Sequence, residues 1–157
     1  MKKDVYVYSI IGLLVDVLTK VVMTIFLSYG KSVTIIDGFF KFTMVHNTGG
    51  AFGLFKNNTL LLGLIGLAFT AVFIYYIEKT ELKLTEKIAC SMILSGIVGN
   101  FIDRVVRGYV IDFLDFNIFG YDYPVFNVAD IFIVVGIAIM VIVTLKENSK
   151  WKIEKKD

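Results

Sequence analysis

The sequence predicts a mainly α-helical integral membrane protein, built as a four-transmembrane-helix bundle with a small β-rich part outside the cytoplasm. Hydrophobic residues make up 57% of the 157 residues, and the mean hydropathy is +0.76. Soluble proteins are only about 45–50% apolar even when glycine is counted, so this composition excludes an ordinary soluble domain. The length fits a single domain, residues 1–157, and the single proline argues against a loop-rich chain.

Four apolar runs predict the transmembrane helices, at about residues 5–27, 60–77, 88–106 and 126–145. A hydrocarbon core of about 30 Å requires roughly 17–25 helical residues, which these runs supply. The third run is the shortest, but Asp103 and Arg104 can lie at the membrane interface and let the helix continue beyond them. The first run follows Met-Lys-Lys as in a signal peptide; because it contains charges and lacks a small-x-small cleavage site, we expect it to be retained.

Basic residues orient this bundle, because cytoplasmic loops of membrane proteins carry an excess of lysine and arginine. One side of the predicted bundle carries ten such residues: Lys2, Lys3, Lys79, Lys83, Lys87, Lys146, Lys150, Lys152, Lys155 and Lys156. The other side carries five: Lys31, Lys41, Lys56, Arg104 and Arg107. We therefore expect both termini in the cytoplasm and the loops 28–59 and 103–125 outside it. The net charge of +2 is too small to indicate nucleic acid as a partner.

The two outer loops differ in pattern. In the first, the β-branched and aromatic stretches 32–36 and 39–45 are separated by Asp37-Gly38, which predicts a small hairpin or sheet. The second contains aromatic residues that we expect at the level of the lipid headgroups, namely Phe113, Phe116, Phe119, Tyr121 and Tyr123. Both loops therefore belong at one membrane surface.

Two aspartates, Asp112 and Asp130, flank the start of the fourth apolar run. Ionisable residues in or beside a membrane span are costly and usually functional. Two carboxylates that converge can share one proton and activate a water molecule. Asn127 is three residues before Asp130 and shares its helix face. The alternative is that Asp130 only serves the helix N-terminus, but Phe126 and Asn127 already begin the run.

Two further polar groups have helical spacing. Asn100, Asp103 and Arg104 lie on one face at the outer end of the third run, where Arg104 can pair with Asp103 or orient a nearby carboxylate or carbonyl group. An interfacial ion pair that ends the helix is the alternative. Asp16 and Lys20 form an i, i+4 pair within the first run; it is most simply structural, although Lys20 could also reach the outer site.

The segment His46-Asn47-Thr48-Gly49-Gly50-Ala51-Phe52 predicts a turn that brings the backbone close to a partner, with an ordinary loop turn as the alternative. We interpret His46 as a polar loop residue, and Asp115 and Asp122 as solvated loop residues. With a single histidine and neither Gly-x-Ser-x-Gly nor His-Glu-x-x-His, serine and zinc protease chemistry has little support. The lone Cys90 excludes a cysteine-cluster metal site and is expected to be a small buried residue.

Five motifs, in order and at proper spacing, resemble those of lipoprotein signal peptidases, the type II signal peptidases of bacteria. They are Asp16-Val-Leu-Thr-Lys20, Asn47-Thr-Gly-Gly-Ala-Phe52, Gly99-Asn-Phe-Ile-Asp-Arg104, Val110-Ile-Asp-Phe113 and Phe126-Asn-Val-Ala-Asp130. The resemblance covers roughly residues 10–145. Gly50 replaces the family's alanine, and Ser95 precedes Gly96 where a glycine is usual; both changes exchange small residues.

The resemblance implies a β-cradle and a short helix or loop outside the cytoplasm, and Asp112 and Asp130 as a catalytic dyad. The implied supporting set is Asn47, Gly49, Asn100, Asp103, Arg104 and Asn127, with Asp16 and Lys20 structurally important. It further implies a bacterial cytoplasmic-membrane enzyme that cuts diacylglyceryl-modified prolipoproteins just before the lipidated cysteine of the lipobox and is blocked by globomycin. We expect no metal or cofactor, membrane lipid as a partner, and a monomer.

Two other functions compete with this interpretation. A small proton-coupled transporter would also contain intramembrane carboxylates, but its ionisable groups would be distributed through the membrane. In this sequence only Asp16 and Lys20 are expected deep in the membrane, and the other candidate ionisable residues gather at one membrane face. A relative that binds lipoproteins without cutting them would not need both Asp112 and Asp130. A turnover assay separates the peptidase from both.

Overall fold

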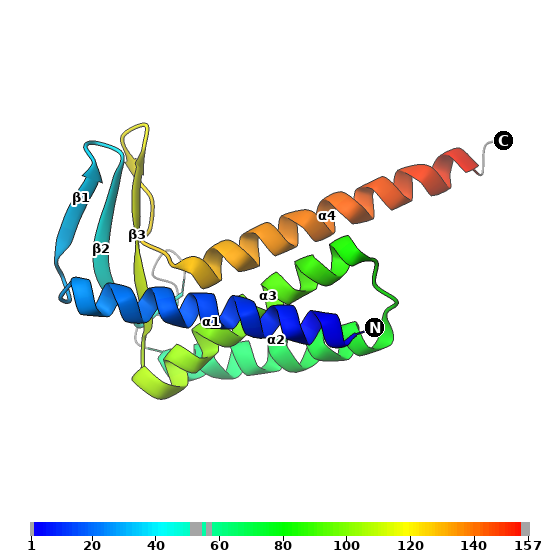
Figure 1. Cartoon of the computed structure of the whole chain (residues 1–157), viewed down its shortest axis with the longest axis horizontal. Coiled ribbons are helices and arrows are strands. Elements are labelled where there is room, and N and C mark those ends of the chain that lie inside the picture. The colour runs from blue at the N-terminus through cyan, green and yellow to red at the C-terminus, as the bar shows by residue number, and fades with distance from the viewer. Residues whose placement is uncertain (1, 51–54, 56–57, 155–157) are drawn as a thin grey trace.

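The fold is a bundle of four long helices that supports a small antiparallel sheet at one end (Figure 1). The computed structural model describes residues 2–50, 55 and 58–154. The helices are α1 (Lys3–Phe26), α2 (Thr59–Lys79), α3 (Leu84–Arg107) and α4 (Val128–Glu154). The strands are β1 (Ser32–Ile36), β2 (Phe40–Asn47), β3 (Val110–Ile118) and β4 (Tyr121–Asp122).

All four helices are long and apolar enough to cross a membrane, in α4 over Val128–Lys146. Their outer surfaces are covered with exposed leucine, isoleucine and valine, which suits contact with lipid. The two chain ends lie at one end of the bundle and the sheet at the other (Figure 1). This arrangement confirms the predicted four-helix membrane architecture.

Helix α3 is the centre of the bundle and packs against each of the other helices. It is also the most buried of the four, which explains why its sequence is less apolar than that of its neighbours. Two glycines allow the close packing. A side chain on Gly96 would collide with the Ala129 carbonyl oxygen of α4, and one on Gly99 would lie 2.5 Å from Asp16 Oδ2 of α1.

Replacing Gly96 by alanine is therefore expected to push α3 and the start of α4 apart. Overpacking of this kind costs about 1–3 kcal/mol, and it displaces the backbone just before Asp130. Thermal unfolding in detergent measures the loss. Gly66→Ala is the matched control, because the added methyl group would meet Phe101 Cβ at an ordinary 3.7 Å. Equal stability of the two variants would contradict close α3–α4 packing.

The sheet has the strand order β1-β2-β3-β4, with antiparallel neighbours. Its strands run across the helix axes rather than along them (Figure 1). Leu27, Met44, Ile111 and Phe113 form a buried apolar cluster that connects the end of α1 to β2 and β3. The sheet is thereby held against the end of the bundle, with one side directed at the helices.

The predicted hairpin in the first loop is confirmed as β1 and β2, and Cys90 is buried as expected. The second loop contains strand β3, which we did not predict. Two interpretations were wrong. His46 lies in β2 rather than in a loop, and Asp115 is buried, accepting a hydrogen bond from Thr43 and pairing with Lys41 at 3.4 Å.

Candidate active site

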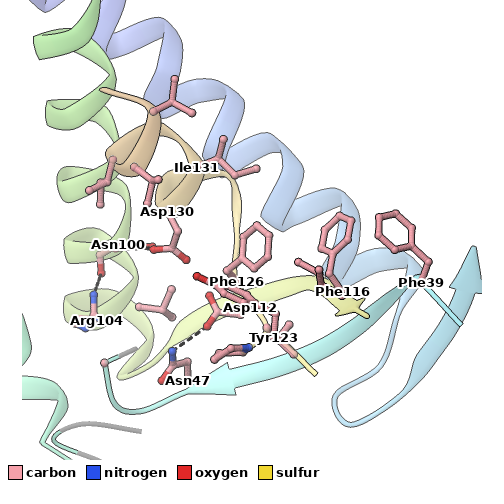
Figure 2. A pocket seen from close by; sticks show the side chains of 18 residues that line it. Phe39, Asn47, Asn100, Arg104, Asp112, Phe116, Tyr123, Phe126, Asp130 and Ile131 are labelled. Carbon is pink, nitrogen blue, oxygen red and sulfur yellow. Dashed lines mark hydrogen bonds between the residues drawn. The ribbon is translucent and has the colours of Figure 1, made fainter. Parts of the chain in front are cut away.

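Asp112 lies in β3 with its carboxylate turned toward the helices. It is only 2% exposed and accepts hydrogen bonds from Asn47 Nδ2 at 2.9 Å and Asn127 Nδ2 at 2.7 Å. Pairing of β2 with β3 places Asn47 opposite Val110, which brings its side chain to Asp112. Figure 2 shows the resulting contact between Asn47 and Asp112.

Asp130 lies in the first turn of α4, and Asn127 caps that helix. The Asn127 backbone N–H donates to Asp130 Oδ2 at 3.1 Å, while the Asp130 backbone N–H donates to Asn127 Oδ1 at 3.0 Å. This reciprocal pair is a capping box. Helix α4 begins at Val128 and not at Phe126, so Asp130 lies nearer the helix N-terminus than we expected and takes part in the cap. Asp130 also accepts a hydrogen bond from Asn100 Nδ2 at 2.8 Å, so capping is not its only contact.

Asn127 joins the two aspartates. Its side-chain nitrogen contacts Asp112 Oδ1 at 2.7 Å and Asn100 Oδ1 at 3.1 Å, and its backbone holds Asp130. The side chain is fully buried, so each of these polar contacts forms away from bulk water. Asn127 therefore fixes the distance and orientation between β3 and the start of α4.

Both carboxylates border one cavity of about 650 Å³ (Figure 2). Asn47, Asn100 and Arg104 add polar groups to its wall. The rest of the wall is mainly apolar and includes Phe39, Phe116, Phe126, Ile131, Val134 and Val135. An apolar cavity with a few converging polar groups is the usual form of a binding site.

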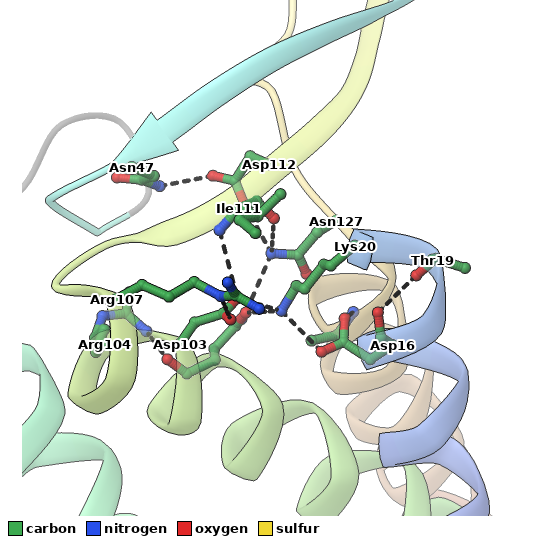
Figure 3. A network of polar contacts seen from close by, with 12 residues as sticks. Asp16, Thr19, Lys20, Asn47, Asp103, Arg104, Arg107, Ile111, Asp112 and Asn127 are labelled. Atoms are coloured by element: carbon green, nitrogen blue, oxygen red, sulfur yellow. Dashed lines mark hydrogen bonds and ion pairs between the residues drawn. The ribbon is translucent and has the colours of Figure 1, made fainter. Parts of the chain in front are cut away.

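A buried ion cluster lies below Asp112 in the view of Figure 3. Lys20 Nζ contacts Asp16 Oδ2 at 2.8 Å, Asp103 Oδ2 at 2.9 Å and Asn100 Oδ1 at 3.1 Å. Lys20 is 1% exposed, so it must be paired to remain charged. The other Asp16 oxygen accepts the Ala129 backbone N–H at 3.0 Å. Lys20 therefore does extend toward the site, as the sequence allowed.

Arg104 takes the second of the two roles that the sequence allowed, because it donates hydrogen bonds to carbonyl oxygens. Asp103 pairs with Arg107 Nε at 3.0 Å, whereas Arg104 donates to the carbonyl oxygens of Asn100 and Gly49 at 3.1 and 3.2 Å. The Gly49 N–H in turn donates to Asn47 Oδ1 at 2.9 Å. Arg104 thus holds the turn after β2, while its Nε is buried without a partner among the described residues. Ala51 and Phe52 of the same motif fall outside the described residues.

The structure thus joins all ten candidate residues in one network drawn from α1, α3, α4, β2 and β3. Sequence reasoning missed two features around it. Phe39, Phe116 and Phe126 form part of the cavity wall. His46 is stacked between Tyr29 and Tyr109, with ring centroids 4.4 and 3.8 Å away. The alternation of aromatic and polar residues along 110–118 could have indicated strand β3 and hence Phe116.

Burial raises the pKa of Asp112 to about 7, and the negative charge of Asp130 contributes further. The hydrogen bonds from Asn47 and Asn127 act in the opposite direction, because they stabilise the charged carboxylate. With this pKa the Asp112 carboxyl group is partly protonated at neutral pH, and a second carboxyl group, that of Asp130, borders the same cavity. Such a pair can act as an acid and a base at once. Among the described residues, no group of three or more histidine, cysteine, aspartate or glutamate residues is arranged to hold a metal ion.

Comparison with known proteins identifies the family of the chain. The family described as Signal peptidase (SPase) II matches residues 8–146. The lipoprotein signal peptidase of Staphylococcus haemolyticus is 36% identical over 157 residues, covering 96% of this chain and 99% of that protein. That of Staphylococcus epidermidis is 37% identical over 153 residues, covering 94% and 95%.

A solved structure of a bacterial membrane enzyme, obtained by the in meso method at 2.3 Å resolution, superposes with a TM-score of 0.85 at 32% identity. It covers 93% of this chain, and this chain covers 90% of it. A second such structure, at 1.9 Å resolution, gives a TM-score of 0.81 at the same identity and covers 90% of this chain. The chain therefore belongs to the signal peptidase II family, and it is a multi-pass membrane protease of that family.

Proposed function

We propose that the protein is an intramembrane aspartyl endopeptidase that removes signal peptides from diacylglyceryl-modified prolipoproteins. The observation that carries the proposal is the placement of Asp112 and Asp130 on one cavity, joined by Asn127. The relatives named lipoprotein signal peptidase support the substrate class. The bond that is cut precedes the lipidated cysteine of the lipobox.

In the proposed mechanism, one ionised aspartate takes a proton from a water molecule that attacks the scissile carbonyl carbon. The protonated aspartate donates a hydrogen bond to the carbonyl oxygen and later a proton to the leaving amine. Asn47 and Asn127 hold Asp112, and Asn100 holds Asp130. No metal ion takes part in this scheme.

The position of the cavity suits a membrane-held substrate. It extends from the aspartates to Val134 and Val135 of α4, which are exposed on a membrane-spanning helix. Acyl chains and a signal helix can therefore stay in lipid while the peptide bond reaches the carboxylates. We place the protein as a monomer in the bacterial cytoplasmic membrane, with both termini in the cytoplasm and the site near the outer face.

The test is cleavage of a purified diacylglyceryl-modified prolipoprotein by the full chain in detergent, followed by mass spectrometry. We expect a product that begins with the lipidated cysteine, and we expect globomycin to prevent its formation. The same precursor without the diacylglyceryl group is the control and should remain uncut. If folded protein leaves both precursors intact while another family member cuts the modified one, the proposed function is wrong.

A pH profile tests how Asn47 acts on the dyad. The pKa of about 7 at Asp112 places the loss of the shared proton near neutrality, so kcat/KM should fall as pH rises above about 7. Asn47→Leu removes a hydrogen bond that favours the charged carboxylate, so the pKa should rise and the alkaline limb should move to higher pH. An alkaline limb that stays in place or moves to lower pH would contradict this role.

A further inference from the structure

The connection between β3 and β4 is a two-residue turn with an unusual residue in it. Ile118 pairs with Tyr121, and Phe119 and Gly120 between them have φ angles of +53° and +84°. Positive φ at both central positions is the type I′ arrangement, for which asparagine followed by glycine is preferred. A phenylalanine in a left-handed conformation is sterically unfavourable, and such outliers often mark a functional contact.

The turn holds Phe119 outward. Asn117 Oδ1 accepts the Gly120 N–H at 2.9 Å, and Asn117 Nδ2 donates to Asp122 Oδ1 at 2.9 Å. The Phe119 side chain is fully exposed, at 105% of its reference area. The hydrogen bonds therefore hold the backbone of the turn that places Phe119 at the tip of the hairpin, where it does not contribute to the protein core.

One face of the hairpin borders lipid-facing surface. Ile118 and Tyr123 line the same cavity as Val134 and Val135, which are 65% and 39% exposed on a membrane-spanning helix. Strand alternation directs Asp115 and Asn117 to the opposite face. That face has a separate hollow of about 230 Å³, bordered also by Thr34, Lys41 and Asp122. The hairpin is therefore mainly apolar on the face toward α4, whereas its opposite face carries the charged side chains that border the second hollow together with Ile36, Phe39 and Phe40.

We propose that the Ile118–Tyr121 turn is a membrane anchor that inserts Phe119 into the lipid leaflet at the sheet end of the bundle. Three observations carry this inference: the left-handed backbone of Phe119, its full exposure, and the continuity of the hairpin with the exposed flank of α4. The anchor holds the mouth of the cavity against lipid. This last consequence rests on the proposed function; the insertion itself does not.

Fluorescence quenching tests the insertion without any turnover. Trp151 is the only tryptophan, so Trp151→Phe provides a background for Phe119→Trp. The protein is reconstituted into vesicles of phosphatidylcholine and phosphatidylglycerol, with or without bromine on the acyl chains. We expect blue-shifted emission that loses intensity in the brominated vesicles. Thr34→Trp, in the same background, is the control on the polar face and should keep its intensity.

The proposal would be overturned if bromine on the acyl chains reduced the emission of Trp at positions 119 and 34 by the same fraction. It would also be overturned if aqueous iodide quenched the emission at position 119 more strongly than that at position 34. Two further variants separate anchoring from turn stability. Phe119→Asn suits the left-handed backbone, so it should unfold at the same or a higher temperature while raising KM and leaving kcat unchanged. Phe119→Leu retains an apolar side chain and should keep the wild-type KM. If both variants had the same KM, the anchor would have no part in substrate access.

Discussion

Replacing either Asp112 or Asp130 by asparagine is expected to abolish cleavage while leaving the protein folded. General acid–base catalysis by a positioned group contributes roughly a hundred- to ten-thousand-fold. The two carboxylates are joined through Asn127, and in the proposed mechanism they share one proton, so kcat/KM should fall by this order in either single variant. The measurement is initial-rate cleavage of the modified prolipoprotein at several substrate concentrations.

Two comparisons make this result specific. Asp122→Asn changes an exposed aspartate on β4 outside the cavity, and its kcat/KM should match that of the wild type. The double variant of Asp112 and Asp130 should be little worse than either single variant, because groups that act as a unit are not additive. Substantial cleavage by both single variants would remove the dyad from the mechanism and direct attention to Asp103 and Arg104.

Replacing Lys20 by methionine is expected to give the largest loss of stability. The change leaves the fully buried Asp16 without a counter-charge, whereas Asp103 retains Arg107. Removing one partner of a buried ion pair costs about 3–5 kcal/mol. Asn100 also loses its contact with Lys20, so Asp130 should be held less firmly. Unfolding in mixed detergent micelles measures the first effect, and cleavage at low temperature measures the second.

Lys87→Met is the matched control, because Lys87 pairs with a half-exposed Asp4 at 2.9 Å at the other end of the bundle. Exposed pairs contribute about 0–1 kcal/mol, so little change is expected. Adding Asp16→Asn to Lys20→Met should restore part of the lost stability, since it removes the unpaired charge. If Lys20→Met were as stable as Lys87→Met, Lys20 would not hold the cluster together.

The four helices and the polar residues of the candidate site could be predicted from the sequence, because both follow from local periodicity. Apolar runs of membrane length predicted the four-helix bundle, and the i, i+3 and i, i+4 spacings grouped Asn100 with Asp103 and Asp16 with Lys20. The β-branched and aromatic pattern of the first loop likewise predicted the β1–β2 hairpin. Motif resemblance supplied the connection between these separate groups.

The hydrogen-bond and ion-pair partners of individual side chains could not be predicted, because they depend on how distant segments of the chain pack together. Arg104 is adjacent to Asp103 in sequence, yet it turns to the Gly49 carbonyl because the turn after β2 lies over the end of α3. Asp115 seemed solvated, but pairing of β2 with β3 places it opposite Lys41. The start of α4 was uncertain by two residues, and this small difference changes Asp130 from an interior position to a capping position.

Helix α4 is synthesised after the other three helices, and its first turn and N-cap bring Asp130 and Asn127 to the site. Before α4 inserts, Asp112 lacks one of its two asparagine donors and its carboxylate partner. A chain that has synthesised only α1, α2, α3 and the sheet therefore holds Asp112 beside a cavity whose α4 wall is still absent. The order of synthesis thus brings the two proposed catalytic carboxylates together only when α4 packs against α3.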